Sequence, residues 1–439
     1  MEKGEYGRRI SELEKSMDFQ LDLLQKQAVE EALTKGVVVV TGGPGTGKTT
    51  TINLMIRCFE MEKMDIVLAA PTGRAAKRMT EATGYEAKTI HRLLEVSGGI
   101  EDGDSSHFEK NEDNPIEADA VILDEMSMVD IHLMYSLLKA IVPGTRLILV
   151  GDSNQLPSVG PGNVLKDIID SKAFSVVRLS KIYRQAESSH IVLNAHKINA
   201  GELITLDNKN KDFFFFEKKD VRSVMGALVY LVKTRLPEYI GASPFEIQVL
   251  TPMRKGELGV EHLNEVLQYY LNPASESKKE KEGRTGVFRE GDKVMQVKNN
   301  YKLEWKITNA KGFSIEEGLG VFNGDMGIIK QINTYSERIT VVFDENREAE
   351  YPFSSLDELE LAYAITIHKS QGSEYPAVVL PLLSGPPILC NRNLLYTAIT
   401  RAQKCVAIAG RQSMVEQMIH NETEQKRYSG LNDCLKEGL

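Results

Sequence analysis

Short runs of apolar residues, bounded by glycine and polar residues, recur along the first half of the chain. They lie at residues 37–40, 66–71, 119–125, 145–152 and 176–179. Runs of this length that are rich in Val, Ile and Leu are typical of strands buried on both faces of a parallel sheet. Apolar positions at helical spacing follow the first run, at Ile52, Met55, Ile56 and Phe59. The pattern predicts alternating strands and helices.

The second half repeats this pattern around a segment of different character. Buried strands are predicted at 212–216, 245–252 and 377–383, and helices at 259–272 and 391–403. Between them, short segments of alternating polarity, separated by turn residues, predict a small antiparallel barrel. These segments are residues 293–298, 326–332, 338–343 and 348–353.

We therefore predict an α/β fold with two units of parallel sheet and helices. The first unit takes residues 1–189, and the second takes residues 190–285 and 359–439. The barrel is inserted in the second unit at residues 286–358. Residues 97–115 are rich in glycine, charge and turn signals, so we expect an exposed hairpin or loop that projects from the first unit.

The loop after the first predicted strand has the composition of a phosphate-binding loop. It reads Gly42, Gly43, Pro44, Gly45, Thr46, Gly47, Lys48, Thr49 and Thr50. This sequence fits G-x-x-x-x-G-K-[ST] between a strand and a helix. Its glycines allow backbone N–H groups to wrap a phosphate, and the helix N-terminus adds positive potential. Lys48 is expected to reach the β and γ phosphates, and the Thr49 hydroxyl to hold Mg²⁺. We predict a nucleoside triphosphate site.

Other polar residues follow the later strands. Asp124 ends the third strand, where it is placed to hold Mg²⁺, and Glu125 beside it is placed to polarise the attacking water. Gln155 follows the fourth strand and is a candidate sensor of the γ-phosphate. Arg184 follows the fifth and is a candidate transition-state cation, although alone it reads as a surface arginine. The amide of Gln25 can read an adenine edge, although alone it also reads as a surface residue.

Candidate nucleic-acid contacts follow the second predicted strand. Thr72 and Arg74 begin a cationic helix, and His91 follows it. Open α/β sheets bind ligands at the carboxyl ends of their strands, so these residues are candidate contacts to a nucleic-acid backbone. A solvated helix face explains the cations equally well.

Composition limits the classes of function. Of the 439 residues, 42% are hydrophobic and 26% are charged, as in ordinary globular proteins. No apolar run reaches membrane-spanning length and no signal peptide is visible, so we expect a cytoplasmic protein without a membrane partner. The four cysteines lack metal-ligand spacing and are expected to be free thiols. The net charge of −9 does not exclude nucleic-acid binding, because a channel needs only local positive charge. No cluster of acids typical of a nuclease is present.

Taken together, these motifs resemble superfamily 1 helicases of the RecD-like branch, the relatives of the exodeoxyribonuclease V alpha subunit. The matching stretches, in the family's order, are LLQKQAV, TGGPGTGKTT, APTGRAAKRM, TIHRLL, VILDEMSMVD, GDSNQLPSVGPGNVL, YRQ, VLTPMRKGELGV, VFNGDMG, TIHKSQGSEY and LYTAITRA. They extend from about residue 20 to 410, and this ordered set is far more specific than the phosphate loop alone.

The resemblance implies two RecA-like P-loop motor domains with ATP between them, and translocation in the 5′-to-3′ direction on single-stranded DNA. It implies that the insert at 97–115 is a β-hairpin pin that splits duplex DNA, and that the barrel closes over the strand. By matching motif, the residues implied to bind nucleotide and Mg²⁺ or to act in hydrolysis are Gln25, Lys48, Thr49, Asp124, Glu125, Gln155, Arg184 and Arg401. Of these, Gln25 reads adenine, and Arg184 and Arg401 are arginine fingers. The implied DNA contacts are Thr72, His91, Thr366 and Ser373, and Glu374 is an implied ribose contact.

Three stretches depart from the family pattern or carry no motif. Stand-alone members usually have a long N-terminal region, whereas this chain begins just ahead of the glutamine motif, so we expect a truncated or short form. Residues 301–320 form a longer polar stretch than the compact pattern, and we expect a loop on the barrel. Residues 275–284 are expected to be a polar linker.

We predict a monomeric ATP-dependent DNA helicase motor that uses ATP and Mg²⁺. Its expected partners are single-stranded and tailed duplex DNA, together with repair or recombination proteins. Two alternatives stay open. One is an RNA or RNA–DNA helicase of the same superfamily, because nothing in the sequence decides whether the 2′-hydroxyl is read. The other is a nucleotide-switched DNA clamp that does not unwind. A relaxase–helicase is not favoured, because no relaxase domain precedes the motor.

Overall fold

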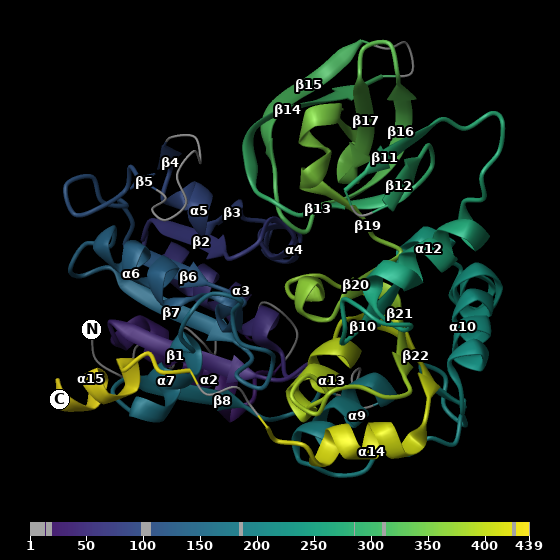
Figure 1. The fold of residues 1–439 in the computed structure, drawn as a ribbon. Helices are drawn as coiled ribbons and strands as arrows, with labels where there is room; N and C mark the ends of the chain where they lie inside the picture. Colours follow the sequence, from purple (N-terminus) through teal and green to yellow (C-terminus); the bar gives the residue numbers. More distant parts are fainter. Residues whose placement is uncertain are drawn as a thin grey trace. The chain divides into compact units, whose positions relative to one another are not determined.

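The computed structural model describes residues 14, 20–97, 107–183, 188–284, 286–309, 313–423 and 427–438. The chain divides into two compact units (Figure 1). Unit 1 consists of residues 1–196 and 425–439, and unit 2 of residues 197–424.

Unit 1 is built on a sheet of six parallel strands in the order β3-β2-β6-β7-β1-β8. The strands are β1 (Val37–Gly42), β2 (Ile66–Ala70), β3 (Ala87–Thr89), β6 (Ala120–Leu123), β7 (Arg146–Gly151) and β8 (Ser175–Leu179). The five apolar runs of the first half predicted five of these strands within about two residues. The short β3 was not predicted, because three residues carry too little pattern.

Helices cover both faces of this sheet because successive strand residues point to opposite sides. Val38 and Val40 of β1 pack with α2 (Leu23–Thr34) and α3 (Lys48–Met61), whereas Val39 packs with the core formed by α6 (Ile131–Lys139) and α7 (Val164–Ser171). The four apolar positions predicted to share one face of α3 are all buried, which confirms that prediction.

Smaller elements of unit 1 follow β2 and β6. They are α4 (Gly73–Thr83), α5 (Ile90–Leu93), β4 (Val96–Ser97), β5 (His107–Phe108) and the 3₁₀ helix η1 (Met126–Met128). β4 and β5 pair antiparallel. They bracket residues 98–106, which lie outside the described residues, so most of the hairpin predicted at 97–115 cannot be compared with the structure.

Unit 2 contains a parallel sheet of five strands in the order β20-β10-β21-β22-β9. The strands are β9 (Phe213–Glu217), β10 (Ile247–Thr251), β20 (Ala364–Thr366), β21 (Tyr375–Leu382) and β22 (Ala402–Gly410). α9 (His190–Asn199) spans the boundary between the two units. The helices of unit 2 include α10 (Val221–Tyr230), a π-helical turn (Leu231–Arg235), α11 (Leu236–Ile240), α12 (Val260–Leu271), α13 (Arg392–Ile399) and α14 (Gln412–His420).

One helix boundary in unit 2 was predicted wrongly. The helix expected at 391–403 ends at Ile399, and the chain enters β22 at Ala402. β22 lies between β21 and β9, and its residues from Cys405 onward are buried. The run of small apolar residues in β22 therefore belongs to the centre of the sheet.

An antiparallel sheet of seven strands completes unit 2, in the order β15-β14-β18-β17-β16-β13-β19. Its strands are β13 (Lys293–Gln296), β14 (Asn300–Thr308), β15 (Ser314–Val321), β16 (Met326–Asn333), β17 (Arg338–Phe343), β18 (Arg347–Pro352) and β19 (Leu359–Leu361). All four alternating segments of the sequence are strands here, which confirms an antiparallel region.

Two polar stretches predicted as irregular are strands. Residues 301–320 were expected to be a loop, but residues 301–308 belong to β14 and residues 314–320 to β15, and these two strands pair with each other. In β14 half-buried Leu303, Trp305 and Ile307 alternate with exposed polar residues, which is the period of a strand with one covered face. The linker expected at 275–284 contains β11 (Glu280–Gly283), which pairs with β12 (Gly286–Arg289).

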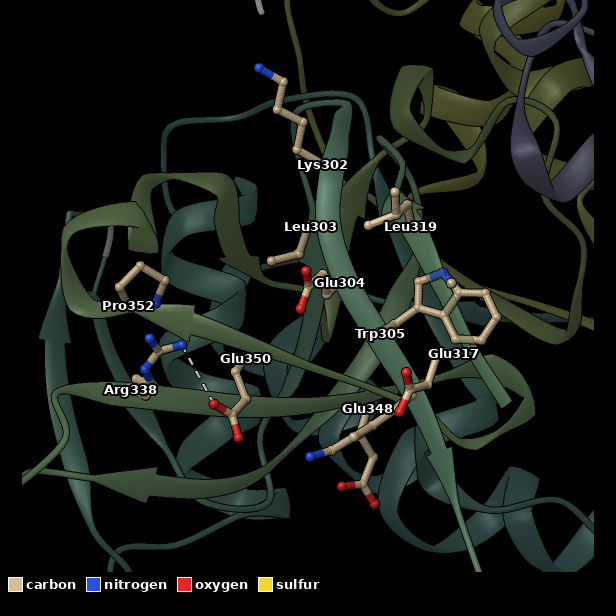
Figure 2. Close-up of a pocket in the computed structure, with 12 residues that line it drawn as sticks. Lys302, Leu303, Glu304, Trp305, Glu317, Leu319, Arg338, Glu348, Glu350 and Pro352 are labelled. Carbon is tan, nitrogen blue, oxygen red and sulfur yellow. Dashed lines mark ion pairs between the residues drawn. The ribbon is translucent and has the colours of Figure 1, made fainter. Parts of the chain in front are cut away.

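A hollow of about 750 Å³ lies beside the β14–β15 hairpin (Figure 2). Trp305 of β14 lies over Gly318 of β15, where a Cβ atom would come within 2.3 Å of the indole ring. Glu304 and Glu317 also line the hollow, and Arg338 forms an ion pair with Glu350 at 3.5 Å on its other side. No residue predicted to bind nucleotide or DNA lines this hollow.

A buried carboxylate joins the antiparallel sheet to α12 and the parallel sheet. Asp292 is fully buried and accepts four hydrogen bonds, from Gln268 Nε2 at 2.6 Å, Asn272 Nδ2 at 2.7 Å, the backbone N–H of Arg289 at 2.6 Å and the hydroxyl of Tyr363 at 2.9 Å. Burial raises the pKa of Asp292, and the hydrogen bonds oppose that change. All four partners are donors, so this position requires an acceptor-only side chain.

We expect Asp292→Asn to destabilise unit 2 by about 2–3 kcal/mol, because its amide group would point N–H donors at buried donors and leave them unpaired. Denaturant-induced unfolding followed by circular dichroism measures this change. Asp344→Asn, at the exposed start of the 3₁₀ helix η4 (Asp344–Asn346), is the matched control and should unfold like the parent. A stability of Asp292→Asn equal to the parent would show that the four contacts do not depend on a carboxylate.

The last residues of the chain pack against unit 1, whereas the second unit was predicted to run to residue 439. The Arg427 guanidinium donates to the carbonyl oxygens of Gly160 and Gly162, the latter at 2.9 Å. Ser429 Oγ donates to Asp167 Oδ2 at 2.6 Å, and α15 (Leu431–Glu437) packs against α7. Residues 427–438, called the C-terminal strap below, therefore contact the loop that follows β7.

Candidate nucleotide-binding site

Four predicted segments of unit 1 converge because parallel strands end at the same edge of a sheet. The phosphate-binding loop follows β1, Thr72 follows β2, Asp124 follows β6 and Gln155 follows β7. These strands are neighbours in the sheet. Thr41 at the end of β1 contacts Ser153 after β7, with 3.4 Å between their hydroxyl oxygens.

The loop has the geometry that its glycines predict. Gly45 and Gly47 adopt left-handed conformations with φ of 74° and 80°, and α3 begins directly after Gly47. Thr46 Oγ1 donates to the carbonyl of Gly43 at 2.8 Å and fixes the turn. Lys48 Nζ donates to the carbonyl oxygens of Gly42 at 2.6 Å and Gly43 at 3.1 Å. The lysine thus folds back over its own loop, where a phosphate can compete for it.

Gln25 is buried beside this loop. Taken alone, its sequence context had favoured an exposed surface residue, so that interpretation was wrong. Gln25 occupies the third position of α2, where its side chain and that of Asp22 form a reciprocal capping box. Its Nε2 donates to the carbonyl of Gly47 at 3.4 Å, and the hydroxyl of Tyr183 donates to its Oε1.

Sequence reasoning did not single out Tyr183. Its hydroxyl oxygen also lies 2.9 Å from Oδ2 of Asp22, so the two acceptors share one proton, and its backbone N–H donates to the carbonyl of Gly45 at 3.2 Å. Burial, followed by the contact with Asp22, raises the pKa of Tyr183. The YRQ motif that contains it was the available signal.

The two acids after β6 differ in their surroundings. Burial, followed by the charge of Glu125, raises the pKa of Asp124 to about 6. Glu125 is buried in a left-handed conformation with φ of 55°, and its N–H donates to Asp124 Oδ1 at 2.8 Å. Its Oε1 lies 2.5 Å from Nη2 of Arg78. The sequence placed Arg78 only in a cationic helix, for which a nucleic-acid contact and a solvated face were equally favoured, so this contact was missed.

Gln155 is buried after β7, and among the described residues its Oε1 has no hydrogen-bond partner. A buried amide oxygen without a partner is costly in an apolar interior. An acceptor in this state is suited to a hydrogen bond from a bound ligand or water.

The donor set fits Mg²⁺ bound together with a nucleotide. Mg²⁺ is usually held by one or two protein oxygens plus phosphate and water. Asp124 and the exposed Thr49 supply oxygens of this kind. In the part of the chain that the structure describes, no cluster of three or more His, Cys, Asp or Glu residues is arranged to hold a metal alone.

The predicted DNA contacts in unit 1 lie on α4 and α5. Thr72 caps α4 and accepts the backbone N–H of Ala75 at 3.2 Å, which leaves its hydroxyl proton free to donate. Arg74 lies in the first turn of α4 and is half-buried. His91 in α5 has its ring centroid 6.0 Å from that of Phe108, and burial lowers the pKa of His91. At neutral pH we therefore expect a neutral imidazole.

Four residues of unit 2 were predicted to bind nucleotide or DNA. Three of them, Ser373, Glu374 and Arg401, lie close together, whereas Thr366 lies on a different strand. Arg401 is buried, and its Nη1 donates to the carbonyl of Ser373 at 3.3 Å. Glu374, next to Ser373, accepts a hydrogen bond from Gln403 at 3.3 Å. Thr366 ends β20, whereas the other three residues precede β21 or β22. Arg184 lies outside the described residues.

Comparison with known families matches three segments of the chain. Residues 25–161 match an AAA domain, residues 263–343 an ATP-dependent RecD-like DNA helicase SH3 domain, and residues 361–409 a UvrD-like helicase C-terminal domain. The RecBCD enzyme subunit RecD of Mycolicibacterium smegmatis is 31% identical over 445 residues, with 94% of this chain and 74% of that protein covered.

The chain belongs to the RecD family of superfamily 1 helicases. The resemblance drawn from the ordered motifs is therefore confirmed.

Further relatives extend this result. The ATP-dependent RecD2 DNA helicase of Deinococcus radiodurans is 36% identical over 386 residues, and the match covers 88% of this chain. The chain spans only 48% of the length of that relative. A solved structure of Pif1 helicases at forked double-stranded DNA shares the fold, with a TM-score of 0.52 at 20% identity, covering 89% of this chain and 92% of that one. Within the described residues, no helix is long and apolar enough to cross a bilayer.

Proposed function

We propose that this chain is the motor of an ATP-dependent DNA helicase that moves 5′-to-3′ on single-stranded DNA and unwinds duplex DNA. The observation that carries the proposal is the convergence of Lys48, Asp124, Glu125 and Gln155 at one edge of a parallel sheet. Family membership supports it, because the relative from Deinococcus radiodurans is named as an ATP-dependent DNA helicase. In this proposal ATP hydrolysis drives the motor, and Mg²⁺, when bound, would supply positive charge next to the phosphates.

The contacts in unit 1 support a separate role in ATP binding or hydrolysis for each of these residues. Lys48 leaves the carbonyls of Gly42 and Gly43 and binds the β and γ phosphates, and Thr49 and Asp124 would hold Mg²⁺. Glu125 accepts a proton from water as the water oxygen bonds to the γ phosphorus and the bridging oxygen departs with ADP. Gln155 orients that water through its unpartnered Oε1. Gln25 reads the adenine beside the loop.

Arg401 is suited to the part of an arginine finger, as is Arg184 by motif. Among the described residues, the Arg401 guanidinium donates to neutral acceptors, namely the carbonyls of Thr397 and Ser373 and the hydroxyl of Thr400. No carboxylate of the described residues forms an ion pair with it. A buried cation without an anion is unfavourable, so a developing negative charge on a phosphate is a fitting partner.

The finer architecture that we propose has two RecA-like motor domains, with a pin at 97–115 and the seven-stranded sheet closed as a barrel over DNA. Thr72, Arg74, His91, Thr366 and Ser373 then contact the strand, and Glu374 contacts a ribose. The pairing of β4 with β5 supports the pin. In the assay below, a chain with residues 98–106 replaced by Gly-Ser residues should hydrolyse ATP but fail to unwind.

The decisive test is strand displacement on matched substrates with 5′-tailed, 3′-tailed and blunt DNA ends, and with an RNA tail. We expect ATP-dependent unwinding of the 5′-tailed DNA alone, with Lys48→Ala as the control that cannot hydrolyse ATP. Fluorescence of a strand pair that carries a quencher follows the reaction.

Other outcomes select the alternatives. Unwinding of the substrate with an RNA tail, but not of DNA, would identify an RNA helicase. DNA binding that depends on ATP without strand displacement would identify a clamp. Absence of DNA-stimulated hydrolysis would overturn the proposal as a whole.

A further inference from the structure

Helix α4 connects two features of unit 1 that the proposed function keeps separate. Its first turn carries Thr72 and Arg74, the proposed DNA contacts. Arg78 lies four residues after Arg74, and residues at this spacing share one face of a helix. The guanidinium of Arg78 reaches Glu125, with 2.5 Å between Nη2 and Oε1. One short helix therefore contacts both the proposed DNA path and the proposed catalytic base.

The contact is stronger than an ordinary surface ion pair. The side chain of Glu125 is 9% exposed and that of Arg78 is 33% exposed. Exposed pairs contribute about 0–1 kcal/mol, whereas partly desolvated, charge-assisted hydrogen bonds are considerably stronger. The left-handed backbone of Glu125 and its N–H bond to Asp124 also fix the direction of the side chain. The geometry thus turns one carboxylate oxygen towards α4.

The contact engages one of the two carboxylate oxygens of the proposed base. A general base must direct a lone pair at the proton that it accepts, within hydrogen-bond reach. The oxygen that Arg78 engages has its lone pair directed at the guanidinium. Free movement of Glu125 towards water requires that the contact lengthen or break.

α4 is held to the rest of unit 1 along its length. Ala75 and Ala76 pack against Ala70 at the end of β2, Met79 is buried in the core that contains α3, and Thr80 Oγ1 accepts the backbone N–H of Ala87 at 2.9 Å. A phosphate bound at the first turn therefore acts on Arg78 through the same hydrogen-bonded helix.

We propose that Arg78 is a positioning residue that restrains Glu125 until single-stranded DNA binds at the start of α4. The restraint rests on the proposed function, and it gives a physical cause for stimulation of ATP hydrolysis by DNA. Arg78 touches neither substrate in this scheme and acts through Glu125.

The test compares Arg78→Ala with the parent in steady-state ATP hydrolysis, with and without a saturating single-stranded oligonucleotide. Without DNA, kcat should rise about tenfold, which is the effect expected from releasing one charge-assisted contact. With DNA, kcat should stay within about twofold of the parent. KM for ATP and the Kd for the oligonucleotide should also change less than about twofold, because no binding contact is removed.

Two further variants separate positioning from a structural role. Lys77→Ala removes the neighbouring cation of the same helix, which pairs with Glu81 at 3.9 Å, and it should behave as the parent. Arg78→Lys keeps the charge and should restore much of the restraint. Arg78→Met removes the guanidinium but keeps an unbranched aliphatic side chain. If Arg78→Ala does not fold, Arg78→Met replaces it, and the same rise in kcat without DNA is expected.

The outcomes are distinguishable. An unchanged rate without DNA in Arg78→Ala would overturn the restraint while leaving the proposed function intact. Loss of activity in both states would overturn it too, because Arg78 would then be needed for catalysis itself. A parent protein whose hydrolysis DNA does not stimulate would instead overturn the proposed function.

Discussion

Glu125→Gln should nearly stop ATP turnover while ATP still binds. The amide cannot accept a proton from water, and general base catalysis contributes about 10²- to 10⁴-fold to rate. The fall in kcat should lie in that range. The glutamine oxygen can still accept the hydrogen bond from Arg78 Nη2, so the local structure should persist. A coupled ATPase assay measures turnover, and titration with a fluorescent ATP analogue measures binding.

Glu117→Gln is the matched control for this substitution. Glu117 is exposed shortly before β6, so its loss should leave kcat unchanged. Near-parental turnover of Glu125→Gln would show that another group accepts the proton.

Arg401→Ala should reduce kcat by about 10³- to 10⁵-fold, the contribution typical of arginine fingers, with little change in ATP affinity. The reason is that a cation placed for the transition state gains most of its interaction as charge develops on the phosphate. Single-turnover hydrolysis and equilibrium ATP binding, measured side by side, separate the two effects.

A buried arginine can also matter for folding, so the control must remove one of similar structural role. Arg392 in α13 donates to the carbonyl of Ile419 at 2.6 Å and pairs with Glu422 at 2.7 Å. Arg392→Ala should lower the unfolding temperature without a selective loss of rate. If Arg401→Ala lost affinity and rate in equal proportion, Arg401 would be a binding residue instead.

The sequence predicted the parallel sheets well because their strands are buried on both faces. The run at 37–40 could be read directly, since all four residues are Val. β14 was missed although Leu303, Trp305 and Ile307 alternate with charged residues. A hairpin with only one covered face has polar residues on its exposed face, so its overall composition resembles that of a loop. The loop prediction relied on this polar composition and on the length of the stretch, and it overlooked the alternation with a period of two residues.

Pairings across the fold could not be predicted in the same way. Helical spacing places Arg78 on the face of Arg74, but only the neighbouring strand order brings Glu125 opposite that face. The C-terminal strap has a seven-residue helix with few apolar residues. The strap is held in place by hydrogen bonds from Arg427 to the backbone carbonyls of Gly160 and Gly162. Every residue has a backbone carbonyl, so these acceptors could not be predicted from the sequence.

The strap also determines what a fluorescent label on this chain would report. Cys58, Cys390 and Cys405 are buried, whereas Cys434 in α15 is exposed. A thiol-reactive dye will therefore mark the end of the chain selectively, and the strap fixes that dye to unit 1 although unit 2 precedes it in sequence. A second cysteine introduced at Tyr335, which is 96% exposed in unit 2, completes a donor–acceptor pair. Energy transfer between the two dyes, measured with and without ATP and DNA, then tests whether the distance between the two labelled units changes.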